Sequence, residues 1–146
     1  MKDIHDYRME ELLRIEITCD RSKKVVAENP DGTSVAFVPF AGVCDSELFR
    51  GETVGDCVDT QLIRPDGTKE ISARYIMRGT DSSGNNCWIY IENNGIVTTE
   101  NGERYSRTWP VIITDSPVLS PLMNEKLYGF SDSRPEGPVI RICRIK

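Results

Sequence analysis

Short segments rich in β-branched and aromatic residues alternate with turn-forming residues along almost the whole chain. Segments of this composition and length are typical of β-strands. Because they recur at short intervals, they predict an antiparallel sheet whose edges are closed or protected. The predicted strands cover residues 34–40, 58–64, 70–78, 87–92, 111–114 and 139–145, and the turns lie at 29–32, 65–67, 81–86, 93–95, 101–102 and 134–138.

The first strand and the candidate helix follow from the spacing of apolar residues. Leu13, Ile15 and Ile17 alternate with polar residues, which predicts a strand near the N-terminus. Helical spacing of apolar residues occurs only over residues 120–128, after Pro121. We therefore expect an all-β fold with at most one short helix.

Residues 58–77 predict a hairpin for which two registers are open. A three-residue loop with Gly67 as a bulge pairs Arg64 with Thr68, whereas an even-length loop pairs Pro65 with Thr68. A slip of one residue moves every side chain of a strand to the other face, so we choose the register that sorts apolar from polar residues better. The even register places Val58, Thr60, Leu62, Ile71, Ala73, Tyr75 and Met77 on one face, and Asp59, Gln61, Ile63, Glu70, Ser72, Arg74 and Ile76 on the other.

Length and charge indicate an acidic folded domain. The 146 residues suffice for one domain, residues 1–146, in which residues 1–8 are expected to form a flexible tail. The 18 Lys and Arg against 23 Asp and Glu give a net charge of −5, so no overall positive field attracts nucleic acid or an anionic membrane. The single histidine, His5, excludes most histidine chemistry.

Several kinds of site are missing from the sequence. The five cysteines have no C-x-x-C spacing and are expected to be reduced and buried. Glycine-rich phosphate loops, G-x-S-x-G and H-E-x-x-H are absent, and the acidic residues near Gly51 and Gly55 lack calcium-loop spacing. We predict no cofactor and no metal. Because neither a signal peptide nor a membrane-spanning stretch is present, we expect a cytoplasmic location.

Short motifs in a fixed order resemble one known family. Their order is similar to that of the uncharacterised family called domain of unknown function 3237, over nearly the whole chain. The resemblance implies a single closed antiparallel β-barrel like that of the lipocalins, with no established reaction. An eight-stranded barrel is either filled by side chains or holds one small ligand. The motifs are Phe40-x-Gly42, Leu48-x-x-Gly51, Asp59-x-Gln61-x-x-Arg64-x-Asp66-Gly67, Ala73-Arg74-Tyr75, Ile89-Tyr90-Ile91-x-Asn93-x-Gly95 and Arg107-Thr108-x-Pro110.

The first candidate site is the polar face of the hairpin. In the even register Asp59 lies opposite Arg74, with Cβ atoms roughly 5 Å apart. On the outside this pair is an ordinary surface salt bridge, whereas inside a barrel its desolvation is costly and function is a reason to keep it. Arg74 would bind an anionic or carbonyl oxygen, Asp59 would orient the ligand or act as a base, and Gln61 would supply a neutral donor and acceptor.

Four further residues complete the candidate ligand-binding set. Tyr75 and Tyr90 are expected to be wall residues whose hydroxyls reach a partner, with proton transfer as the alternative. Asn93 is expected in a turn that ends a strand, with ligand contact at the barrel mouth as the alternative. Arg107 lies before Pro110 in a segment expected to cover an open end.

Three functional hypotheses stay open. The first is a small-molecule-binding barrel that takes an apolar or aromatic compound with an anionic or carbonyl oxygen. The second is a cofactor-free isomerase, cyclase or lyase that uses Asp59 with Arg74 or a tyrosine. The third is a filled barrel that serves as an oligomerisation or interaction module. The expected partner is a small molecule, without nucleic acid or membrane, and a homo-oligomer stays open.

Overall fold

A computed structural model describes residues 8–146 as one continuous antiparallel sheet with two short 3-10 helices. Residues 1–7 of the predicted tail, which include His5, therefore lie outside the described residues. The strands are β1 (Met9–Cys19), β2 (Val25–Glu28), β3 (Ser34–Asp45), β4 (Phe49–Val54), β5 (Cys57–Ile63), β6 (Lys69–Asp81), β7 (Asn86–Glu100), β8 (Glu103–Thr108), β9 (Val111–Thr114), β10 (Tyr128–Asp132) and β11 (Val139–Ile145), and the helices are η2 (Arg21–Lys23) and η3 (Ser120–Asn124).

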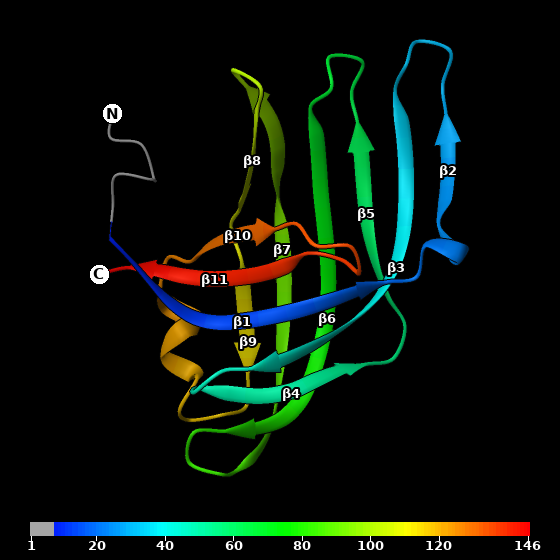
Figure 1. The fold of residues 1–146 in the computed structure, drawn as a ribbon. Coiled ribbons are helices and arrows are strands. Elements are labelled where there is room, and N and C mark those ends of the chain that lie inside the picture. The colour runs from blue at the N-terminus through cyan, green and yellow to red at the C-terminus, as the bar shows by residue number, and fades with distance from the viewer. Residues whose placement is uncertain (1–7) are drawn as a thin grey trace.

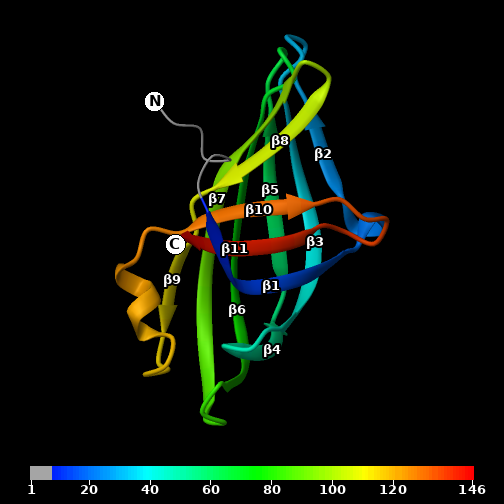
Figure 2. The ribbon, with the colours of Figure 1, turned by 60° about the vertical axis from the view of Figure 1, so that its left-hand side comes forward.

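The strands close into a barrel. Following the hydrogen-bonded neighbours, the ring runs β1, β3, β5, β6, β7, β8, β10, β11 and back to β1. The β4 strand joins β3 to β6 below β5, and β9 pairs with β7 below β8. Figures 1 and 2 show β1, β11 and β10 crossing the long strands β6 and β7. The predicted all-β antiparallel barrel is thus confirmed.

Helical structure within residues 8–146 is confined to two short 3-10 helices. The η3 helix lies within the region predicted as helical, after a leucine N-cap and with Pro121 in its first turn. The η2 helix was not predicted; it forms because the Asp20 carboxylate accepts a hydrogen bond from the Ser22 backbone N–H at 3.2 Å. No helix within residues 8–146 is long and apolar enough to cross a membrane.

The turn between β5 and β6 sets the register of the site. The Arg64 N–H donates to the Thr68 carbonyl at 2.8 Å, and the Gly67 N–H donates to the Arg64 carbonyl at 2.9 Å. Gly67 has a φ of +89°, which favours glycine. The Asp66 carboxylate accepts from the Thr68 N–H at 2.9 Å. This is the three-residue loop with a glycine bulge, so the predicted even register is wrong.

The observed register changes which residues face the barrel interior. Asp59 pairs with Ala73 and Gln61 with Ile71, so the predicted juxtaposition of Asp59 and Arg74 is also wrong. Asp59 and Gln61 share the inner face with Ala73, because directly paired residues point to the same side of a sheet. Arg74, one residue further along β6, points outward.

The lower part of the barrel is a solid apolar core. Phe49, Met77, Ile89 and Leu119 are each at most 1% exposed. The alternation predicted for the first strand is confirmed, since Leu13, Ile15 and Ile17 are all buried on β1. Above this core, the rings of Phe40 and Tyr75 meet edge to face with centroids 5.5 Å apart. They separate the packed half of the interior from an open half.

All five cysteines are free thiols, and four of them are buried. Burial raises the pKa of the Cys44 and Cys143 thiols, which keeps them protonated and poorly nucleophilic. The fifth, Cys19, is half-buried at the end of β1. The four buried thiols therefore behave as small apolar core residues, as predicted, whereas the prediction of burial is wrong for Cys19.

Candidate functional site in the barrel lumen

The upper half of the barrel contains a cavity of about 470 Å³. This volume is within the range of small-molecule sites. Its back wall is formed by β3, β5, β6 and β7, and its front by the end of β1 and the β10–β11 hairpin. The hairpins β2–β3, β5–β6 and β7–β8 extend beyond β10 in both views and surround the mouth (Figures 1 and 2). The apolar walls are Ile17, Val38, Phe40, Ile71, Ala73, Val97, Pro138 and Ile140.

One side-chain oxygen of Tyr75 and one of Asn93, both at the base of the cavity, have no hydrogen-bond partner among the described residues. Tyr75 and Asn93 are 4% and 5% exposed. Within residues 8–146, neither the Tyr75 hydroxyl nor the Asn93 Oδ1 finds a partner. Burial raises the pKa of Tyr75, so its hydroxyl stays protonated and can donate. Each unpartnered buried polar group costs about 1–3 kcal/mol, which makes both atoms candidates for ligand contact.

Among the described residues, Asp59 is the only acidic side chain that lines the cavity. Gln61 Nε2 donates a hydrogen bond to Asp59 Oδ2 at 2.9 Å. Burial raises the pKa of Asp59, although the bond from Gln61 and the positive charge of Lys69 oppose this shift. A carboxyl with a raised pKa in a cavity is a better base and acid near neutral pH than an exposed one.

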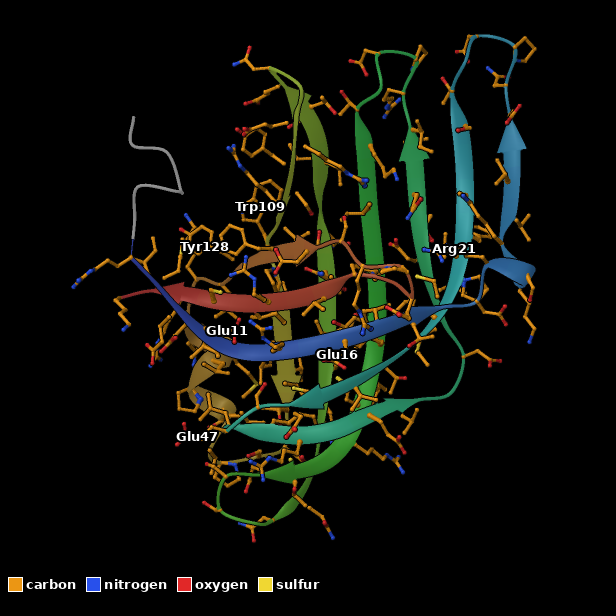
Figure 3. The ribbon with its side chains drawn as sticks, in the orientation of Figure 1. Glu11, Glu16, Arg21, Glu47, Trp109 and Tyr128 are labelled. Carbon is orange, nitrogen blue, oxygen red and sulfur yellow. The ribbon has the colours of Figure 1, made fainter. Side chains whose placement is uncertain are left out.

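Basic side chains surround the mouth. Arg21 in η2, Lys24, Lys69 on β6, Arg104 on β8 and Arg134 after β10 all line the cavity. Arg21 is labelled at the edge of the barrel in Figure 3 and donates to the Pro135 carbonyl at 2.6 Å. Within residues 8–146 no carboxylate lies within salt-bridge distance of Lys24, Lys69 or Arg104. Burial and the charges of Arg104 and Lys24 lower the pKa of Lys69, although the negative charge of Asp59 opposes this shift.

The structure brings together only part of the predicted site. Asp59, Gln61, Tyr75 and Asn93 line the cavity, whereas Arg74, Tyr90 and Arg107 do not. Arg74 is 64% exposed at its side chain and pairs with Glu92, with Nε and Oε1 3.4 Å apart. The Tyr90 hydroxyl donates to the same Glu92 Oε1 at 2.8 Å on the outer face.

Two positional predictions on β7 and β8 are wrong. Asn93 and Gly95 do not form a turn, because β7 continues through them. Gly95 is needed for close packing instead, since a Cβ there would collide with the Arg107 carbonyl. The segment ending at Pro110 runs along β7 and does not cover the mouth; Arg107 faces Tyr105, with its guanidinium carbon 5.8 Å from the ring centroid. Trp109 is on the outside (Figure 3) and 48% exposed.

The comparisons with known proteins place the chain in a family. The family model described as "Protein of unknown function (DUF3237)" matches residues 7–145. A UPF0311 protein of Clostridium acetobutylicum is 30% identical over 98% of this chain and 97% of its own length. The chain belongs to the DUF3237 family. The resemblance seen in the sequence motifs is therefore confirmed.

Solved structures show the same barrel. A protein of unknown function from Clostridium acetobutylicum has a TM-score of 0.81 and 30% identity, covering 95% of this chain and 99% of that one. A β-barrel-like protein from Acinetobacter baumannii has a TM-score of 0.78 and 15% identity, covering 95% and 96%. An enzyme from Penicillium herquei has a TM-score of 0.68 and 16% identity, covering 96% and 95%. At these identities, the last two structures show only that the fold is shared.

The basic side chains at the mouth of the cavity in this DUF3237 protein were not predicted from the sequence. Once the glycine bulge is accepted, Lys69, Ile71, Ala73 and Tyr75 fall on one face by simple alternation. Lys69 was therefore accessible to sequence reasoning. Arg104 was not, because its position follows from the pairing of β8 with β7. Within residues 8–146 no group of three or more His, Cys, Asp or Glu side chains could hold a metal ion.

Arg134 ties the front of the mouth together, and its removal should destabilise the DUF3237 barrel. Arg134 donates from Nε to the Gly137 carbonyl at 3.0 Å and from Nη2 to the Ile17 carbonyl at 2.8 Å. We expect Arg134→Met to lower the free energy of unfolding by about 1 kcal/mol in urea titrations, because two half-buried carbonyls lose their donors. Arg50→Met, at an exposed arginine, is the control, and equal losses in both variants would contradict the expectation.

Proposed function

We propose that the lumen binds a small apolar or aromatic molecule that carries an anionic or carbonyl oxygen. This proposal is carried by an open cavity that has, among residues 8–146, unpartnered buried polar atoms at its base and three cations without an ion pair at its mouth, Lys24, Lys69 and Arg104. A packed barrel that serves only as an interaction module would not need either feature. The presence of about 470 Å³ of open space therefore favours binding over the filled-barrel hypothesis.

The charge distribution supports an anionic or carbonyl oxygen on the ligand. The whole chain has a net charge of −5, yet five basic side chains and one acidic side chain of the described residues line the cavity. Cations gathered in a partly enclosed space repel one another, and a bound anion relieves this repulsion. The anchor for the ligand oxygen thus shifts from Arg74, which points outward, to the mouth cations Lys69 and Arg104.

Filling the cavity tests this function. Ala73 lies on the inner face between Asp59 on β5 and Asn93 on β7. We expect Ala73→Phe to reduce small-molecule retention at least fivefold, because the added ring occupies the ligand volume. Native mass spectrometry of the purified protein, followed by extraction and mass analysis, measures retention.

The control for this experiment is Ile76→Phe, which adds a ring at a position 42% exposed on the outer face of the same strand. It should retain the ligand as the unmodified protein does. Retention of the same molecules by both variants, or no molecule retained by either the unmodified protein or the control, would contradict binding in the lumen.

Cofactor-free proton transfer is a second candidate function, favoured by the raised pKa of Asp59. Asp59 as carboxylate would remove a proton from a carbon beside a ligand carbonyl, and the Tyr75 hydroxyl would donate a hydrogen bond to the enolate oxygen. Return of the proton to another carbon gives an isomer. The fold of the Penicillium herquei enzyme is similar, which is compatible with chemistry in such a barrel.

Deuterium exchange distinguishes catalysis from binding. We expect the retained ligand, incubated with the protein in D₂O, to gain deuterium on carbon in the presence of the unmodified protein and not with Asp59→Asn. Mass spectrometry of the extracted ligand measures the gain. Equal exchange with both proteins, or none with either, would argue against catalysis by Asp59 and leave binding as the function.

A further inference from the structure

We propose that the ligand is a hydroxy acid bound end-on, with an uncharged hydroxyl at the base of the lumen and a carboxylate at the mouth. This inference rests on the binding function proposed above and specifies its ligand. The two ends of the cavity differ in the hydrogen bonds and charges they require, and a hydroxy acid supplies both sets.

The base of the lumen requires a group that both donates and accepts. Asn93 Oδ1 can only accept, whereas the Tyr75 hydroxyl can donate. Both atoms are buried without partners among residues 8–146. The Asp59 carboxylate, on the same level of the sheet as Asn93 through their common partner Ala73, also accepts. A ligand hydroxyl donates to Asn93 or Asp59 and accepts from Tyr75. A ligand carboxylate there cannot donate and would be repelled by Asp59.

The mouth requires negative charge. Lys69, Lys24 and Arg104 line it without a carboxylate within salt-bridge distance among the described residues. Burial lowers the pKa of Lys69, and the charges of Arg104 and Lys24 add to this shift against the opposing charge of Asp59. Arg104 can hold a carboxylate by two parallel hydrogen bonds, and Lys69 adds a third donor. Binding of a carboxylate would offset the repulsion among the three cations.

The depth of the lumen sets the length of the ligand. Lys69 and Ala73 lie on the same inner face of β6, and a strand rises about 3.3 Å per residue, so the two levels are roughly 13 Å apart. The lysine side chain bridges part of this distance. An aromatic ring with a short unsaturated chain spans the remainder and packs against Val38, Ile71 and Val97. The hydroxycinnamates have this length and both end groups.

Three matched probes test the inference by isothermal titration calorimetry: 4-hydroxycinnamate, cinnamate, which lacks the phenolic hydroxyl, and 4-hydroxycinnamyl alcohol, which lacks the carboxylate. We expect 4-hydroxycinnamate to bind about tenfold more tightly than either of the others. Tyr75→Phe should remove most of its advantage over cinnamate. Lys69→Met and Arg104→Met should each reduce its advantage over the alcohol, and binding should weaken with salt.

The controls separate a local effect from a loss of folding. Tyr90→Phe removes a hydroxyl on the outer face and should leave all three affinities unchanged. Tyr75→Phe removes a hydroxyl that has no partner among the described residues, so the thermal stability of the variant should be at least that of the unmodified protein.

Equal affinity for the three probes, or an advantage that survives Tyr75→Phe, would overturn the hydroxy-acid inference while binding in the lumen stands. Absence of binding by all three probes would overturn it too, and ligand retention in the Ala73→Phe experiment decides the proposed function separately.

Discussion

Gly79→Ala is expected to lower the free energy of unfolding by about 3 kcal/mol or to prevent folding altogether. Gly79 on β6 pairs with Gly51 on β4, where β4 closes the lower end of the barrel between β3 and β6. A Cβ on Gly79 would collide with the Arg50 carbonyl oxygen and lie 2.6 Å from the Gly51 Cα. Because both are backbone atoms, the two strands would have to separate, and the cost exceeds that of ordinary overpacking. Urea unfolding followed by tryptophan fluorescence measures it.

Gly42→Ala is the matched control for this substitution. A Cβ on Gly42 would meet the Ile17 Cδ1 at 2.9 Å and the Ile15 Cγ2 at 3.2 Å, which are side-chain methyl groups and not backbone atoms. The Ile17 methyl can move away by rotation about χ2, and the stiffer Ile15 side chain has to yield by only a few tenths of an ångström, so the loss should be about 1 kcal/mol or less. If Gly42→Ala costs as much as Gly79→Ala, close backbone approach is not the reason for glycine at position 79.

The barrel could be predicted from alternation and turn residues, but the register of its central hairpin could not be found by the criterion applied. That criterion assumes that one face of a strand is uniformly apolar. Here the inner face carries Asp59, Gln61 and Lys69 beside Ile71, and the outer face carries exposed Val58 and Ile76. A lumen that binds a polar molecule is lined by both polar and apolar residues. The register that best separates polar from apolar side chains therefore assigns the wrong residues to the inner face.

Turn chemistry was the better guide to this hairpin. The sequence Pro65-Asp66-Gly67 provides a glycine for positive φ and an aspartate that accepts from the Thr68 N–H, and the structure uses both. These local requirements are independent of what the strands enclose. They therefore determine register even where hydrophobic patterning is misleading.

The remaining differences between the predicted and the observed site concern residues that reach the cavity from strands far apart in the sequence. Asn93 was recognised as a candidate, but the motif Asn-x-Gly resembled a turn, whereas Gly95 serves close contact with β8 in the middle of a long strand. Arg104 and Arg134 reach the mouth from β8 and from the loop after β10. Their convergence depends on barrel closure between strands far apart in sequence, which local patterns do not contain.

Asp59→Asn is expected to stabilise the protein by about 1–2 kcal/mol at pH 8, because it removes a partly buried charge. Burial raises the pKa of Asp59 in the folded state above its ordinary value near 3.9. Between these two pKa values the folded protein holds a proton that the unfolded chain has lost. Stability therefore falls as the pH rises through this window, and the full penalty persists above it.

The pH dependence makes this prediction specific to the carboxyl group. Thermal unfolding from pH 3 to pH 8 should give equal stability for Asp59→Asn and the unmodified protein at the acidic end and a growing advantage for the variant as the pH rises. Asparagine keeps the acceptor for Gln61 Nε2, so the hydrogen bond is not the variable. Asp56→Asn, at an exposed position three residues earlier, should show no such divergence.

A stability gain at Asp59 would bear on function as well as on folding. A carboxyl that destabilises the folded state at neutral pH is not there for packing, and an amide of the same shape would serve the fold better. If Asp59→Asn gains stability and loses affinity for the retained ligand, the penalty is linked to binding. If the variant is less stable than the unmodified protein at every pH, the carboxylate contributes to the fold and its assignment to the ligand site is wrong.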